Sequence, residues 1–87
     1  MISRKATVKN RNGLHIKPAA ALCAEAVKYK CLITFSFDTV TANAKSLLSI
    51  LGACVHSGEV IDIVCDGEDE REALNHMCRI VEEGLGE

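Results

Sequence analysis

One short segment carries the residue types from which phosphoryl chemistry can be built. His15 follows a turn at Gly13 and precedes Ile16, the first residue of a helical pattern. The first N–H groups of a helix, here those of Ile16 and Lys17, lack a carbonyl partner inside the helix, and the helix dipole adds partial positive charge there. An anion beside the His15 ring would therefore meet two backbone donors and the Lys17 ammonium together.

This arrangement favours a histidine that accepts a phosphoryl group and releases it again. The positive helix end disfavours an imidazolium, and a neutral imidazole is nucleophilic. A phosphorylated ring carries added negative charge, which the same helix end stabilises. A loop histidine before a helix is more often a cap or a solvated side chain, so the segment alone leaves both interpretations open.

The elements that must position this segment follow from hydrophobic periodicity and turn residues. The pattern predicts strands at residues 2–9, 32–37, 40–43 and 60–65, and helices at 16–28, 47–51 and 69–84. The order is then β-α-β-β-α-β-α. We expect a single α+β domain over residues 1–87, an open-faced two-layer sandwich with three helices on one face of a four-stranded antiparallel sheet.

Local signals place the helix ends and the core. Pro18 falls in the first turn of its helix, Ser46 can N-cap the short helix, and Asp69 with Glu72 resembles a capping box. The residues expected to face the core from the later elements are Ile33, Phe35, Phe37, Ile61, Ile63, Cys65, Leu74, Met77, Cys78 and Val81.

Length and composition exclude several functional classes. The chain has 87 residues, a formal net charge of −2 and 3% aromatic residues. Such a domain cannot enclose a large substrate cavity, and its charge and aromatic content do not suit nucleic-acid binding. Residues 1–45 carry +6 and residues 46–87 carry −8. This asymmetry indicates an anionic ligand or partner for the first half, unless folding interleaves the two halves.

The cysteines and the first residues indicate a cytoplasmic protein with reduced thiols. The five cysteines are odd in number and no two stand in a C-x-x-C spacing, so we expect core thiols, no metal and no cofactor. We also expect neither a signal peptide nor a membrane span. His56 and His76 have no ligand at metal spacing and are assigned no role.

Three segments together resemble the HPr family, the histidine-containing phosphocarriers of the bacterial phosphoenolpyruvate-dependent sugar phosphotransferase system. Residues 12–20 (NGLHIKPAA) resemble the family's phosphohistidine segment, and residues 43–51 (NAKSLLSIL) its regulatory-serine segment. Residues 67–70 (GEDE) and 83–86 (EGLG) resemble the start of its last helix and its tail. Their order and spacing match the family over almost the whole chain.

The resemblance implies a phosphoryl carrier rather than an enzyme. His15 would take a phosphoryl group on Nδ1 from phosphorylated enzyme I and pass it to a histidine of an enzyme IIA domain. Lys17 and the backbone N–H of Ile16 would stabilise that group. We expect a monomer without nucleic-acid or membrane partners. The alternative is a regulatory relative of the same fold, acting in a nitrogen-related branch or in carbon catabolite repression.

The chain departs from the family pattern in two places. Lys17 stands where the family usually has arginine, and lysine offers phosphate a point charge instead of a planar fork. The rate of transfer or the choice of partner can therefore differ. Asp38, Thr39 and Val40 stand where many relatives have a glycine-containing turn, which affects a hairpin and not the function.

Ser46 combines two roles. Spacing alone makes it an N-cap, and the resemblance adds phosphorylation by a bifunctional HPr kinase/phosphorylase. A phosphate is electrostatically favourable at a helix N-terminus. Its charge would lie beside neighbouring leucines, so an apolar partner surface would reject the phosphorylated form and transfer through His15 would slow.

The short helix carries more leucines than it can bury. Exposed apolar residues near a functional histidine mark an interface. We expect this surface to dock enzyme I and enzyme IIA. The leucines concerned are Leu47, Leu48 and Leu51, and the rim residues are Lys17, Ala20 and Lys45.

Two other functional classes remain open from the sequence. The chain can be a thiol or metal module that uses its cysteines and histidines, which thiol titration and metal analysis would detect. It can also be a small interaction domain without chemistry, for which His15→Ala would keep full activity in cells.

Overall fold

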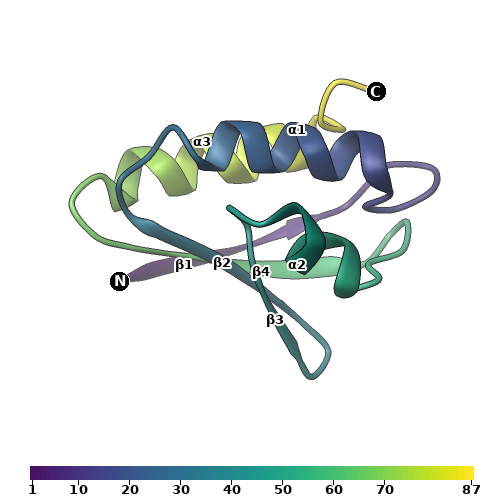
Figure 1. The fold of residues 1–87 in the computed structure, drawn as a ribbon, viewed down its shortest axis with the longest axis horizontal. Helices are drawn as coiled ribbons and strands as arrows, with labels where there is room; N and C mark the ends of the chain where they lie inside the picture. The colour runs from purple at the N-terminus through teal and green to yellow at the C-terminus, as the bar shows by residue number, and fades with distance from the viewer.

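A computed structural model describes all 87 residues and forms a four-stranded sheet with three helices (Figure 1). The elements are β1 (Ile2–Thr7), α1 (Ile16–Ala26), β2 (Leu32–Phe37), β3 (Val40–Asn43), α2 (Leu47–Gly52), β4 (Val60–Asp66) and α3 (Glu70–Glu82). The predicted β-α-β-β-α-β-α order and the α+β sandwich are confirmed. None of the three helices combines the length and apolarity needed to cross a bilayer.

The strands lie in the order β1-β4-β2-β3, and all three pairings are antiparallel. Alternation of apolar and polar residues decides which face is covered. In β2, Ile33 lies opposite Cys65 of β4, and Phe35 lies opposite Ile63. All four side chains are buried. The helices pack on this face and leave the other face open (Figure 1).

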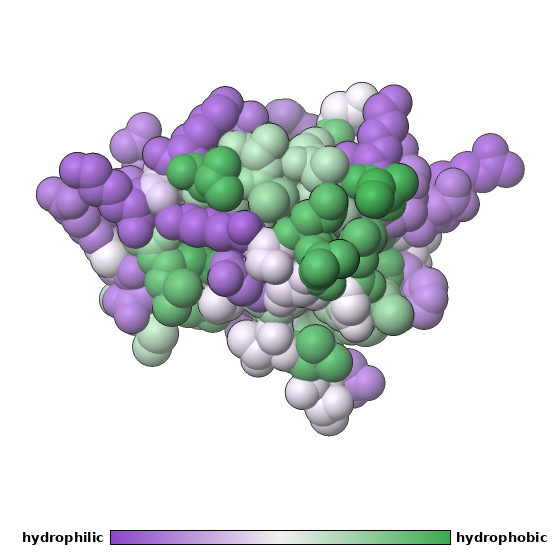
Figure 2. Space-filling view, in the orientation of Figure 1, coloured by the Kyte–Doolittle hydropathy of each residue, from purple (hydrophilic) through white to green (hydrophobic).

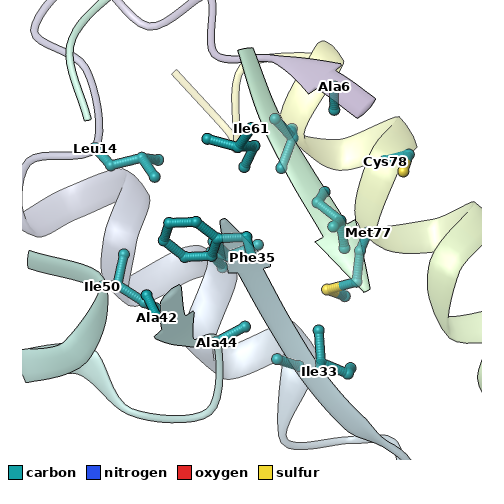
Figure 3. Close-up of a cluster of buried hydrophobic side chains, with 14 of the residues drawn as sticks. Ala6, Leu14, Ile33, Phe35, Ala42, Ala44, Ile50, Ile61, Met77 and Cys78 are labelled. Carbon is teal, nitrogen blue, oxygen red and sulfur yellow. The ribbon is translucent and has the colours of Figure 1, made fainter. Parts of the chain in front are cut away.

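A continuous hydrophobic core joins the sheet to the helices. Figure 3 shows Phe35 of β2 between Leu14, Ile50 of α2 and Ile61 of β4, and all four are almost fully buried. Leu14 belongs to the loop that precedes α1. That loop is therefore fixed to the core by a side chain immediately before His15.

The first helix ends two residues earlier than predicted. α1 ends at Ala26, and the N–H groups of Lys28 and Tyr29 donate to carbonyls three residues back, at 3.2 Å each. Such 3₁₀-type bonds tighten the end of a helix and rotate its side chains. Val27 lies within the helix predicted at 16–28, whose apolar residues recur at helical spacing, but its side chain is 56% exposed.

The predicted capping box at the start of α3 does not form. Asp69 is the N-cap residue, but its carboxylate makes no hydrogen bond within the cap. It accepts instead from the backbone N–H groups of Lys30 and Cys31, at 2.9 Å each. Glu72 is exposed. A tertiary contact to the start of β2 has replaced the local one.

This use of Asp69 makes stability depend on pH in acid. The backbone N–H groups of Lys30 and Cys31 lower the pKa of Asp69 from 3.8 to about 2. Because the pKa is depressed in the folded state, the stabilisation is present above pH 3.8 and is lost as the pH falls through about 2. We expect Asp69→Asn to be less stable than the parent protein above that window. The free energy of unfolding of Asp69→Asn, measured in urea, should change less between pH 3.8 and about 2 than that of the parent protein.

Glu68→Gln is the matched control for this measurement. Glu68 is the neighbouring acidic residue and is exposed, so its variant should retain the parent pH dependence. A parent-like pH dependence in Asp69→Asn would contradict the assignment.

Candidate functional site

His15 lies where the loop after β1 enters α1, and backbone contacts hold that loop on both sides. The N–H of Gly13 donates to the carbonyl of Asn10 at 2.9 Å, which closes the predicted turn, and Gly13 has a φ of 69°. The N–H of Leu14 donates to the carbonyl of Val55 at 3.0 Å. The loop is thereby joined to the segment that follows α2.

His15 is the N-cap residue of α1, with φ −77° and ψ −174°. Its carbonyl accepts the N–H of Ala19 at 2.9 Å, while its ring makes no capping hydrogen bond. The N–H groups of Ile16 and Lys17 are the first two of α1 and have no carbonyl partner inside it, and Pro18 has none to offer. The structure thus places the ring beside two unused donors at the positive end of α1.

A carboxylate that no sequence pattern indicated lies against this ring. Oε2 and Oε1 of Glu87 are 3.1 and 3.3 Å from Nε2 of His15, whose side chain is 35% exposed. Nδ2 of Asn10 donates to Oε1 of Glu87 at 2.8 Å. The hydrogen bond from Asn10, and secondarily the His15 ring, lower the pKa of the Glu87 carboxyl. The carboxylate is thus ionised at neutral pH.

Two other predicted residues lie on the exposed side of α1. Lys17 and Ala20 are both exposed. The positive charge of Lys17 also contributes to lowering the pKa of Glu87, so the ammonium acts on the same corner of the molecule as the ring. A role of Lys17 toward an anion at His15 stays a prediction.

The apolar surface near His15 differs in composition from the predicted leucine cluster. Leu48 is 81% exposed, whereas Leu47 and Leu51 are partly buried and pack against the core. The side chain of Ile16, which we had considered only for its N–H, is 61% exposed. Figure 2 shows apolar surface over α2 and the start of α1. We call Ile16, Leu48 and the exposed parts of Leu47 and Leu51 the apolar patch.

Lys45 and Ser46 lead into α2, and the side chain of Lys45 reaches the segment just after α1. Oγ of Ser46 accepts the N–H of Ser49 at 3.3 Å, so the predicted N-cap is confirmed. Nζ of Lys45 donates to the carbonyl of Tyr29 at 2.6 Å, just beyond the C-terminal end of α1. A helix of 11 residues is about 16 Å long. The Lys45 ammonium is therefore held near the C-terminal end of α1, and its place at the rim of a docking surface stays a prediction.

The other two histidines have different surroundings. His56 is exposed. Nδ1 of His76, on α3, is 2.6 Å from the hydroxyl of Tyr29, and its Nε2 is 3.3 Å from Oε1 of Glu25. A neutral ring satisfies both when Nδ1 accepts from the hydroxyl and Nε2–H donates to the carboxylate. His76 therefore ties α3 to the end of α1, a structural role that the sequence did not predict.

The five cysteines differ in burial. All five cysteines are free, and three of them are buried, as expected for small core residues: Cys31, Cys65 and Cys78. Burial raises the pKa of the Cys65 thiol to about 12, and a thiol of so high a pKa is a poor nucleophile. No three His, Cys, Asp or Glu side chains form a group that could hold a metal ion.

The fold and the site together define a small open-faced sandwich that presents one histidine ring at a helix N-terminus. Residues 2–83 match the PTS-HPr family, described as the PTS HPr component phosphorylation site. Phosphocarrier protein HPr of Haemophilus influenzae is 33% identical over 81 residues, which cover 93% of this chain and 95% of that protein. The chain belongs to the HPr family of phosphocarrier proteins of the phosphotransferase system.

Two further relatives bear on the role and the assembly. The HPr-like protein Crh of Bacillus subtilis is 31% identical over 83 residues, covering 95% of this chain and 98% of that protein. A crystal structure of HPr from Thermoanaerobacter tengcongensis is 33% identical, covers 100% of this chain and 98% of that one, and superposes with a TM-score of 0.94. HPr of that organism has also been solved as a dimer, so the monomer expected for this chain stays a prediction.

Proposed function

We propose that this chain carries phosphoryl groups within a phosphoenolpyruvate-dependent phosphotransferase system. His15 accepts the group from phosphorylated enzyme I and passes it to a histidine of an enzyme IIA domain. The observation that carries this proposal is the position of the His15 ring. It is partly exposed at the N-cap of α1, where it makes no capping bond and adjoins two unused N–H groups.

Catalysis of phosphoryl transfer is almost entirely positioning and electrostatic stabilisation, so this small site suffices. A phosphoryl group on the ring is favoured by the N–H groups of Ile16 and Lys17 and by the positive end of α1. The Lys17 ammonium adds a mobile point charge. The same charges act on the transition state in either direction, which suits a carrier that must both load and unload.

Two different enzymes have to reach the same ring, and the surface around it allows this. The ring is 35% exposed, and the apolar patch adjoins it on α1 and α2. We propose that the patch docks enzyme I and enzyme IIA in turn, with Lys17 and Ala20 at its edge. Exposed apolar surface of this kind marks protein interaction sites.

Incubation with phosphoenolpyruvate and enzyme I tests the proposal. Mass spectrometry should show the mass gain of one phosphoryl group, which mild acid removes. His15→Ala should abolish the gain because no other ring occupies the helix N-terminus. His56→Ala removes an exposed histidine that is not at a helix N-terminus and should keep the gain. A full gain in His15→Ala would overturn the proposal.

A second candidate role is regulatory, and two observations favour it. Ser46 caps α2, where an added phosphate would be favoured, and the chain is similar to Crh as well as to HPr. Because Ser46 caps α2 and His15 caps α1, a phosphate on Ser46 would act on partner docking at the apolar patch and not on the ring. HPr kinase/phosphorylase would be the modifying partner.

The acceptor of the phosphoryl group separates the two roles. After loading by enzyme I, the chain is mixed with sugar-specific enzyme IIA domains. Transfer to one of them supports the carrier in sugar uptake. Phosphorylation of Ser46 by HPr kinase/phosphorylase without such transfer supports the regulatory role.

A further inference from the structure

We propose that Glu87 is a positioning residue for phosphoryl transfer. Its carboxylate holds the His15 ring in the tautomer whose Nδ1 carries the free lone pair, and it counters the positive charge that the ring gains on phosphorylation. The inference rests on the proposed role of His15 as the phosphoryl acceptor.

The contact with the ring admits one assignment of the protons. Both carboxylate oxygens of Glu87 lie within 3.3 Å of Nε2 of His15. An ionised carboxylate only accepts hydrogen bonds, so Nε2 must carry the proton that it accepts. A neutral imidazole has a single N–H, and Nδ1 is then left as the nucleophile. The contact thus selects the nitrogen that the family resemblance implies.

The segment that follows α3 holds this carboxylate in place. Leu85 is only 6% exposed, and its N–H donates to the carbonyl of Ile80 at 2.9 Å. Nδ2 of Asn10 bridges the Gly84 carbonyl, at 2.7 Å, and Oε1 of Glu87, at 2.8 Å. Asn10 is itself only 4% exposed. A buried anchor and a buried amide therefore fix Glu87 before any phosphoryl donor arrives.

The transfer step conserves the Nε2 proton. The Nδ1 lone pair of His15 forms the new N–P bond while the N–P bond of the donor's phosphohistidine breaks, and that electron pair returns to the donor's imidazole. The accepting ring becomes positively charged and keeps its Nε2–H. The negative charge of Glu87, 3.1 Å from Nε2, stabilises this form, since hydrogen bonds between charged groups are the stronger ones. Unloading is the same step reversed.

Two variants at Glu87 separate the hydrogen bond from the charge. Glu87→Gln keeps an oxygen that can accept from Nε2–H but removes the charge, and Glu87→Ala removes both. Glu83→Gln is the matched control, because Glu83 is an exposed acidic residue at the end of α3 that does not touch the ring. Nitrogen-15 NMR of His15 in alkaline solution, where imidazoles are neutral, reports the tautomer directly.

We expect the Nε2–H tautomer to dominate in the parent protein, in Glu87→Gln and in Glu83→Gln, and to lose that dominance in Glu87→Ala. The rate of phosphorylation by enzyme I should fall about tenfold in Glu87→Ala and about threefold in Glu87→Gln. It should be unchanged in Glu83→Gln.

A parent-like tautomer ratio and rate in Glu87→Ala would overturn the inference. The NMR measurement needs no phosphoryl donor, so it also distinguishes the two possible failures. If the parent protein is never phosphorylated, the proposed function fails whatever the tautomer. If it is phosphorylated and Glu87→Ala behaves like it in both measurements, only the role of Glu87 fails.

Discussion

Gly13→Ala is expected to destabilise the protein by about 3 kcal/mol and to reduce phosphorylation of His15 more than tenfold. Gly13 has a φ of 69°, and an added Cβ would overlap the Val55 carbonyl oxygen and lie 2.8 Å from Cα of His56. Both are backbone atoms, so neither can swing aside. The loop would have to move and break its hydrogen bond from Leu14 to Val55, which shifts the ring away from the start of α1.

Urea unfolding and the enzyme I reaction measure the two effects separately. Gly52→Ala is the control, because a Cβ at this α2 position meets nothing within 4 Å. It should change stability by no more than about 1 kcal/mol, toward greater stability, since alanine is the better helix former. Parent-like stability and phosphorylation in Gly13→Ala would contradict this prediction, because the loop would then accommodate the Cβ without displacing His15.

Leu48→Asp is expected to slow transfer from enzyme I about 30-fold without destabilising the fold. Leu48 is 81% exposed, so a carboxylate there remains in water in the free protein. In a complex the apolar patch would be covered, and the carboxylate would lose its hydration without gaining a partner. Rates at several concentrations of the carrier should show the loss as weaker binding.

The choice of Leu48 over its neighbour makes this test specific to docking. Leu47 is partly buried and packs against the core, so an aspartate there would also destabilise the fold. Leu32→Asp is the matched control: Leu32 is 54% exposed in β2, where it alternates with buried Ile33 and so faces away from the helices. An equal loss of rate in both variants, or no loss in Leu48→Asp, would argue against docking at the apolar patch.

The position of Ser46 indicates how its phosphorylation could regulate the protein. Ser46 begins α2, whereas His15 begins α1. A phosphate at Ser46 would leave the ring and its N–H donors unchanged. It would instead add charge at the edge of the apolar patch, and so would alter which partners bind.

Ion pairs between the two halves of the chain offset part of its uneven charge distribution. Basic residues of the first half pair with acidic residues of the second, as Lys9 does with Glu82 at 3.0 Å and Lys30 with Glu68 at 3.8 Å. The two halves therefore interleave. Near the site, exposed Lys17 and the positive end of α1 supply local positive charge.

The sequence by itself determined the elements, their order and the histidine at the start of α1. These depend on short-range features: alternating strands, residues that recur every three to four positions, and turn or cap residues. Such features are written within a few positions of each other, and they placed His15, Ser46 and the core faces correctly. Because these signals are local, they predict the ends of helices less accurately. The end of α1, for example, depends on how its last turn packs against the rest of the molecule.

Only the tertiary structure decided the partners of the polar side chains. Glu87 meets His15 across 72 positions, Tyr29 meets His76 across 47, and Asp69 leaves its own helix for the N–H groups of residues 38 and 39 positions away. A carboxylate or a ring bonds whatever donor the topology brings within about 3 Å, and no local period encodes that choice. The candidate acceptor histidine could therefore be found from the sequence alone, whereas the carboxylate that contacts its ring could not.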